Sequence, residues 1–280
     1  MKSFLYLSSL LLLTLVSACS NNSTKDNQNG NSVSSDTLKY EMKIIDKIFP
    51  MQYEHDKDTT IIKIVYPVFD SLSAFGKNLN DTIIERTVLA KQDDEGNFIN
   101  SHYLSIDEFV DSLLYEFKLF LGDNPITIPW YNYSNVEVLN NTSNLLSIKY
   151  DIRIFLGGLH ENISVVFDNY DRKSGKRITI DDVFKDKNDK ALLKIGEFYF
   201  KETREIPQKE NLQKNNIFEA AWLDVNQKAG FYFNNNFLID KDCLIFYYNE
   251  YEIAPYSFGT TELKIPLEKI RPYLKNSFKY

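Results

Sequence analysis

The chain contains 280 residues, of which 43% are hydrophobic and 25% charged, and its formal net charge is −7. This balance is typical of a folded protein and excludes collagen-like, low-complexity and fully disordered chains. The acidic excess argues against nucleic acid as a partner, because phosphates are recognised by basic surfaces. Phe, Tyr and Trp make up 14% of the chain. A basic partner, or an uncharged glycan stacked on aromatic rings, therefore fits better.

Residues 1–18 have the pattern of a secretion signal. Lys2 supplies a positive charge, residues 4–16 are apolar apart from Ser and Thr, and small residues stand directly before Cys19. Such a run is too short to span a bilayer as a helix. Small residues before a cysteine resemble a bacterial lipobox, which implies cleavage before Cys19 and a lipid on that residue. The alternative is an ordinary signal peptide with a chance cysteine.

Residues 19–37 contain few apolar side chains and are expected to form a flexible tether. If Cys19 carries the lipid, Cys243 is the one remaining cysteine, so no intramolecular disulfide and no cysteine-based zinc site is expected. No other apolar run is long enough for a transmembrane helix. We therefore expect the membrane to be a partner through the lipid on Cys19.

The remaining sequence alternates between helical and strand periodicities. Ser105 and Glu108 form a capping-box pattern, and residues 145–155 alternate regularly between two faces. In chain order we expect strands at 38–48 and 60–68, helices at 78–88 and 105–120, strands at 145–155, 163–167 and 177–180, a helix at 191–201, strands at 230–234, 244–251 and 261–265, and a short helix at 267–274. These elements predict an α+β fold with mostly antiparallel sheets and a few packed helices.

Catalytic motifs are scarce. The three histidines are His55, His102 and His160, and the first two are expected at the surface, with no pair of metal ligands on a helix face. His160 follows Gly157 and Gly158, and a positive φ is expected at both glycines in a hairpin turn. His160 either caps this turn or faces a ligand. Because nucleophile, phosphate-binding and dinucleotide motifs are missing, we assign no catalytic residue, metal or cofactor.

Three stretches together resemble the RsiV-like domain of unknown function. They are the Gly-Gly-Leu-His-Glu-Asn turn at 157–162, the segment 168–184, and the segment 246–274, which contains Tyr-Glu-Ile-Ala-Pro-Tyr. Residues 38–155 resemble the PdaC-like domain that usually precedes it, although the match there is confined to Tyr66-Pro67 and Asn78–Asn80. The resemblance implies two α+β domains, at 38–155 and 156–280.

This resemblance also implies a secreted or envelope-anchored bacterial module. Relatives include the extracellular part of an anti-sigma factor that binds lysozyme and the non-catalytic N-terminal part of a peptidoglycan deacetylase. These 280 residues show neither a sigma-binding segment with a transmembrane helix nor a deacetylase domain, so neither activity can be transferred. Leu159 replaces the small residue that usually stands in the turn motif.

The leading hypothesis is a binding protein, lipid-anchored in the bacterial cell envelope as a periplasmic or surface-exposed protein, that recognises a lysozyme-like protein or peptidoglycan. Its candidate ligand-binding residues are His160, Glu161, Tyr251, Tyr256 and Phe258. The last two either form a rigid recognition loop or plug the end of the domain. The alternative hypothesis is a hydrolase of cell-wall glycan or peptide in which His160 and a carboxylate act as acid and base. A pocket at His160 would favour the enzyme, whereas a flat aromatic face would favour binding.

Overall fold

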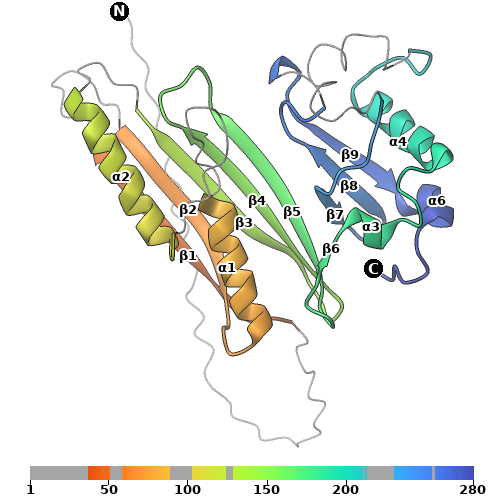
Figure 1. Ribbon diagram of the computed structural model, residues 1–280, viewed down its shortest axis with the longest axis horizontal. Helices are drawn as coiled ribbons and strands as arrows, with labels where there is room; N and C mark the ends of the chain where they lie inside the picture. The colour runs from red at the N-terminus through yellow and green to blue at the C-terminus, as the bar shows by residue number, and fades with distance from the viewer. Residues whose placement is uncertain are drawn as a thin grey trace, which may run out of the picture. The chain divides into compact units, whose positions relative to one another are not determined.

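The computed structural model describes residues 37–50, 59–88, 103–123, 129–210, 212, 230–253 and 256–280. They form two sheets with helices packed against them (Figure 1). Every strand pairing among these residues is antiparallel except one, so the expected α+β class is confirmed. None of the helices in these ranges is long and apolar enough to cross a membrane. Cys19, His55 and His102 lie outside them.

The first sheet has six strands whose spatial order follows the chain. They are β1 (Tyr40–Pro50), β2 (Thr59–Phe69), β3 (Tyr131–Asn141), β4 (Leu145–Phe155), β5 (Asn162–Asp171) and β6 (Arg177–Ile178). The parallel pair is β2 with β3, where Ile61 lies opposite Tyr131. The alternation expected in β4 is confirmed, because Leu146, Ile148, Tyr150, Ile152 and Ile154 are all buried.

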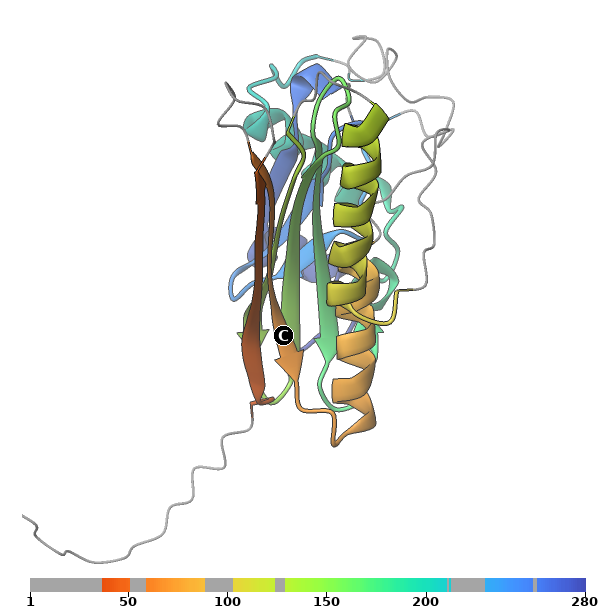
Figure 2. The same cartoon turned by 90° about the vertical axis from the view of Figure 1, so that its left-hand side faces the viewer.

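Two helices, α1 (Ala74–Val88) and α2 (Ile106–Asp123), cover one face of this sheet (Figure 2). The predicted cap of the second helix is confirmed. The Glu108 amide donates to Ser105 Oγ at 3.1 Å, and Glu108 Oε2 accepts from the Leu104 amide at 2.8 Å. Apolar side chains of both helices and of β1–β5 meet in one core under this face.

The buried carboxylate of Asp168 links α1 to the sheet. Arg86 of α1 donates to both its oxygens at 3.2 Å, and Arg177 Nε of β6 lies 2.6 Å from Oδ1. Asp168 is fully buried, whereas both arginines keep contact with solvent. Two guanidinium groups thus compensate the desolvation of one carboxylate, and removing either would leave a partly unpaired buried charge.

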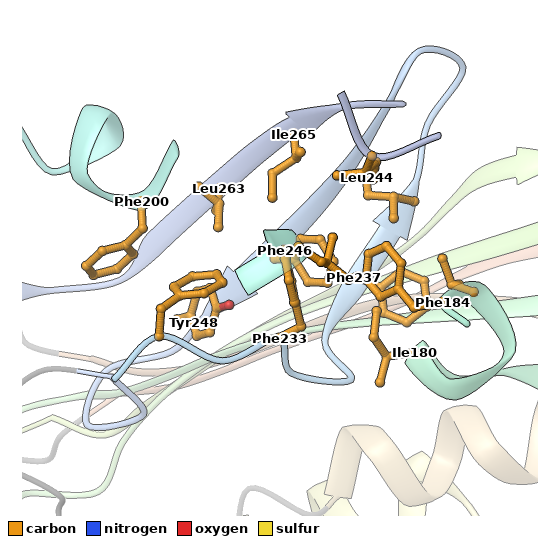
Figure 3. Packing of buried hydrophobic residues seen from close by; sticks show 14 of the residues in the cluster. Ile180, Phe184, Phe200, Phe233, Phe237, Leu244, Phe246, Tyr248, Leu263 and Ile265 are labelled. Atoms are coloured by element: carbon orange, nitrogen blue, oxygen red, sulfur yellow. The ribbon is translucent and has the colours of Figure 1, made fainter. Parts of the chain in front are cut away.

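The second sheet has three antiparallel strands, β7 (Phe237–Ile239), β8 (Cys243–Tyr248) and β9 (Thr261–Pro266). The helices of this part are α3 (Ile180–Val183), α4 (Lys190–Thr203) and α6 (Leu267–Ile270), and the 3-10 turns are η1 (Tyr256–Phe258) and η2 (Arg271–Tyr273). Its core is rich in aromatic rings (Figure 3). The centroids of Phe233 and Phe246, for example, lie 4.9 Å apart.

The strand predicted at 230–234 is wrong. Phe231 and Phe233 are buried alternately, but they pack against Gly196 of α4, where an added Cβ would lie 2.1 Å from the ring of Phe231. The structure shows no strand pairing for these residues. Asn234 instead donates its side-chain amide to the Tyr247 carbonyl at 2.8 Å. The alternation of apolar residues in this segment therefore reflects alternate burial and not pairing in a sheet. Strand β7, which was not predicted, begins only at Phe237.

The domain boundary expected between residues 155 and 156 falls in the turn between β4 and β5. These two strands are neighbours in one sheet, with Leu145 opposite Asp171 and Ile154 opposite Asn162 at the ends of their pairing. The division into two domains stays a prediction. In the fold as described, the two predicted parts share a sheet.

Candidate functional site

The turn between β4 and β5 holds His160 at the surface. Gly157 has a φ of +82°, which glycine adopts readily. Gly158 has no positive φ, so the expectation that both glycines need one is wrong for the second. His160 Nδ1 lies 2.8 Å from the carbonyl oxygen of Glu161. Because a carbonyl oxygen only accepts, Nδ1 donates this bond and the ring is fixed on its own turn.

The chain leaves β8 through a turn that contains Tyr251 in a left-handed conformation, with a φ of +64°. The carboxylate of Glu252 fastens this turn, accepting from the Asn249 amide at 3.0 Å and from Asn234 Nδ2 at 2.6 Å. Burial raises the pKa of Glu252, although both hydrogen bonds oppose that shift. The Tyr232 hydroxyl donates to the Glu252 carbonyl at 3.0 Å. The turn is thus held from both sides.

Three of the five candidate residues come together where these two turns meet, and we call His160, Tyr251 and Tyr256 the ring cluster. The rings of His160 and Tyr256 stack with centroids 4.1 Å apart and planes at 26°. The Tyr251 hydroxyl lies 3.3 Å from His160 Nε2, the nitrogen left to accept when Nδ1 carries the proton of a neutral ring. Tyr251 is 42% exposed and His160 is exposed. The side chain of Phe258 lies outside the described part.

Two carboxylates border the ring cluster. Glu161, the fourth candidate, accepts from the Tyr131 hydroxyl at 3.0 Å. The pKa of Glu250 is raised, foremost by burial and then by the charge of Glu161, while His160 opposes the shift. The pKa of Tyr256 is raised by desolvation and by both glutamates. Neither Glu250 nor Tyr131 could be predicted as part of this site, because nothing in the sequence around them indicates that they lie near Glu161.

Two asparagine amides bring the turns together. The Val165 amide of β5 donates to Asn249 Oδ1 at 2.8 Å, and Asn249 Nδ2 donates back to the Val165 carbonyl at 3.0 Å. Asn236 repeats the pattern, accepting from the Phe167 amide at 2.8 Å and donating to the Val165 carbonyl at 2.7 Å. Side chains therefore satisfy the Val165 amide and carbonyl and the Phe167 amide at the β5 edge beyond its short pairing with β6, and Asn249 ties β5 to the turn that carries Tyr251.

The groups around His160 determine which chemistry it could support. His160 is exposed, and no carboxylate among the described residues forms an ion pair with it. The titratable group within hydrogen-bond reach is the Tyr251 hydroxyl, which is no carboxylic acid. The described residues contain no group of three or more His, Cys, Asp or Glu arranged to hold a metal. Burial raises the pKa of the Cys243 thiol, which disfavours the reactive thiolate.

Comparison with protein families places part of this site in a known domain. Residues 181–268 match the model of DUF3298, a protein family of unknown function. These residues are similar to the DUF3298 family domain. They contain Tyr251 and Tyr256, whereas His160 precedes the matched region. A domain of unknown function in the C-terminal part is thereby confirmed, and the finer likeness to RsiV-like and PdaC-like domains stays a prediction. No curated protein sequence matches the chain.

Two solved structures of DUF3298 proteins share the fold. The structure of a family member from Bacteroides fragilis has a TM-score of 0.63 at 20% identity, covering 86% of this chain and 95% of its own. One from Pseudomonas aeruginosa has a TM-score of 0.60 at 21% identity, covering 86% of this chain and 96% of its own. The likeness thus extends well beyond the DUF3298 match. At these identities it establishes the fold alone.

The two glycines of the turn should respond differently to substitution. Gly157→Ala should lower the free energy of unfolding by about 1 kcal/mol or more, because its φ is positive and the new Cβ would lie 3.3 Å from Trp130 Nε1. Gly158→Ala is the matched control, since its Cβ would meet nothing closer than 3.9 Å. Urea unfolding measures both. Equal losses for the two variants would contradict this account.

Removing the Asn249 side chain should loosen the ring cluster. Asn249→Ala deletes both bonds to Val165 and should cost about 1–3 kcal/mol of unfolding free energy, since buried amide partners lose their bonds. Hydrogen exchange at the Val165 amide should accelerate in the same variant. Asn188→Ala, at an exposed position outside this contact, serves as control. Unchanged protection of Val165 would show that Asn249 does not hold the edge of β5.

Proposed function

We propose that the protein is a lipid-anchored binding protein of the bacterial cell envelope and that the ring cluster is its recognition site. The observation that carries the proposal is the contact of three rings from two segments far apart in the sequence, with His160 stacked on Tyr256 and Tyr251 tilted beside them, at the surface rather than in a core. Rings that are already packed against each other lose little rotamer freedom on binding. Such a surface suits recognition of a partner.

The charges around the ring cluster indicate a basic partner. Glu161 and Glu250 stand at its border, and each contributes to the raised pKa of Tyr256. The chain is acidic overall, which favours encounter with a basic protein. An arginine or lysine side chain of the partner would meet aromatic faces and carboxylates in one place. A lysozyme-like protein has this chemistry, and peptidoglycan, whose sugars can stack on the same rings, is the second ligand to test.

Truncating the rings should weaken binding without unfolding the protein. Tyr256→Ala and Tyr251→Ala should each reduce affinity for lysozyme by about tenfold or more, the loss typical of an aromatic anchor. The measurement is titration calorimetry with the full-length lipoprotein in detergent, with soluble peptidoglycan fragments as a second titrant. Tyr115→Ala on α2 is the matched control, because that ring is 63% exposed and belongs to another element.

The result separates the hypotheses. Loss of lysozyme binding in both ring variants, with wild-type affinity in Tyr115→Ala, supports the proposal. If the ring variants lose binding only to the peptidoglycan fragments, the ring cluster remains the recognition site and its ligand is peptidoglycan instead of lysozyme. Undiminished binding of both ligands by both ring variants would refute the ring cluster as the recognition site, and a collapsed thermal transition would show that these rings serve folding instead.

The anchor is a separate part of the proposal. Cys19 lies outside the described residues, so its support is the lipobox-like sequence before it. Cys19→Ala should release the protein from the membrane fraction into the soluble fraction, because the acylated cysteine is then missing. Fractionation followed by immunoblotting measures this. A Cys19→Ala variant that remains entirely with the membranes would show that another feature attaches the protein.

A further inference from the structure

Among the residues that the structure describes, the first strand of the large sheet has a free edge. The sheet begins with β1 and ends with the two-residue β6, and among the described residues β1 pairs only with β2 (Figure 1). The register of β1 with β2 is continuous over eleven residues, so no bulge interrupts it. Long uninterrupted edges are templates for another strand, and proteins usually shorten, bend or cover them.

The direction of the backbone groups can be read from the neighbouring strands. The Ile61 amide of β2 donates to the Trp130 carbonyl on the β3 side, so the odd residues of β2 face β3 and the even ones face β1. With Ile64 opposite Ile45, the odd residues of β1 then bond to β2. The backbone groups of Met42, Ile44, Asp46 and Ile48 therefore point to the free edge.

Three of these four residues expose apolar side chains beside that edge. Ile44 is 66% and Ile48 is 65% exposed, and Met42 is exposed as well. They lie on the face opposite the helices, since the helix-covered core takes Ile45 of β1. A strand added to this edge would pair with the backbone groups and cover the large aliphatic side chains beside them.

The charges of β1 select one way in which two copies can pair. Two identical edges related by a two-fold axis must run antiparallel, which leaves a choice of register. If Ile44 lies opposite its own copy, Glu41 lies opposite Lys47 on both sides of the axis and residues 40–48 of each strand pair. Every other same-face register that pairs seven or more residues sets like charges opposite: Lys43 against Lys43, Lys43 against Lys47, Asp46 against Asp46, or Lys47 against Lys47.

We propose that two copies of this chain associate through antiparallel pairing of their β1 strands, centred on Ile44, with Glu41 of each copy opposite Lys47 of the other. Glu41 and Lys47 are both exposed. The six-stranded sheets would then continue across the two-fold axis. The ring cluster lies on other elements, so this association is independent of the proposed recognition site.

Charge exchange tests the register. Glu41→Lys places like charges opposite twice in the proposed register and leaves the like-charge pairs of the other registers in place, so it should raise the dimer dissociation constant about tenfold or more, whereas Glu41→Lys with Lys47→Glu should restore dimerisation. Sedimentation velocity of the full-length protein in detergent, over a concentration series, measures this. A wild-type protein that stays monomeric throughout, or a double variant that dimerises as weakly as Glu41→Lys alone, would overturn the proposal.

Cross-linking tests the same register without relying on charge. In a Cys243→Ser background, Glu41→Cys with Lys47→Cys should give a disulfide-linked dimer on mild oxidation. Within one strand these positions are about 20 Å apart, so they cannot bond to each other. The control is Lys43→Cys with Lys47→Cys. These two positions face each other only in the register centred on Ile45, so this variant should cross-link far more slowly. Equal or faster cross-linking of the control pair would refute the pairing centred on Ile44.

Discussion

The amides of Asn236 and Asn249 take the place of a neighbouring strand along β5. Each side-chain amide uses its oxygen as an acceptor and one N–H as a donor, which matches the groups that the strand edge presents at Val165 and Phe167. These backbone groups are satisfied without a further strand, and Asn249 holds the turn after β8 next to the turn after β4. The ring cluster exists because these two turns are held side by side, so its geometry depends on contacts that contain no residue of the cluster.

The conformation of Tyr251 follows from the same contacts. A left-handed φ is unfavourable for a residue with a Cβ, and such residues persist where surrounding bonds fix them. Here Glu252 bonds to the Asn249 amide and to Asn234, which anchors the residues on both sides of Tyr251. The conformational free energy needed to place the Tyr251 ring beside His160 is thus supplied during folding. Binding of a ligand does not have to supply it again.

The sequence predicted features that rest on local periodicity or local hydrogen bonds. The alternation in 145–155 and the cap at Ser105 both follow from neighbours along the chain, and both are confirmed. The strand at 230–234 failed because alternate burial arises from packing on α4 as well as from pairing in a sheet. Such packing is not encoded in the spacing of apolar residues.

The candidate site was predictable in part for the same reason. His160, Glu161, Tyr251 and Tyr256 were found because a glycine turn and aromatic stretches are visible in the sequence, and the structure places these four near one another. Glu250 and the role of Asn249 were not found. Each acts through a partner far away along the chain, and an amide that imitates a strand has no periodic signature.

The parallel pairing of β2 with β3 has a consequence for the order of assembly. β1 and β2 are close in sequence, as are β3 to β6, so each group can form by short-range closure. The junction between the groups forms only when the chain from Phe69 to Tyr131, which includes both helices, has been brought across the sheet. This long closure raises the contact order, so the sheet should form more slowly than one built of hairpins alone.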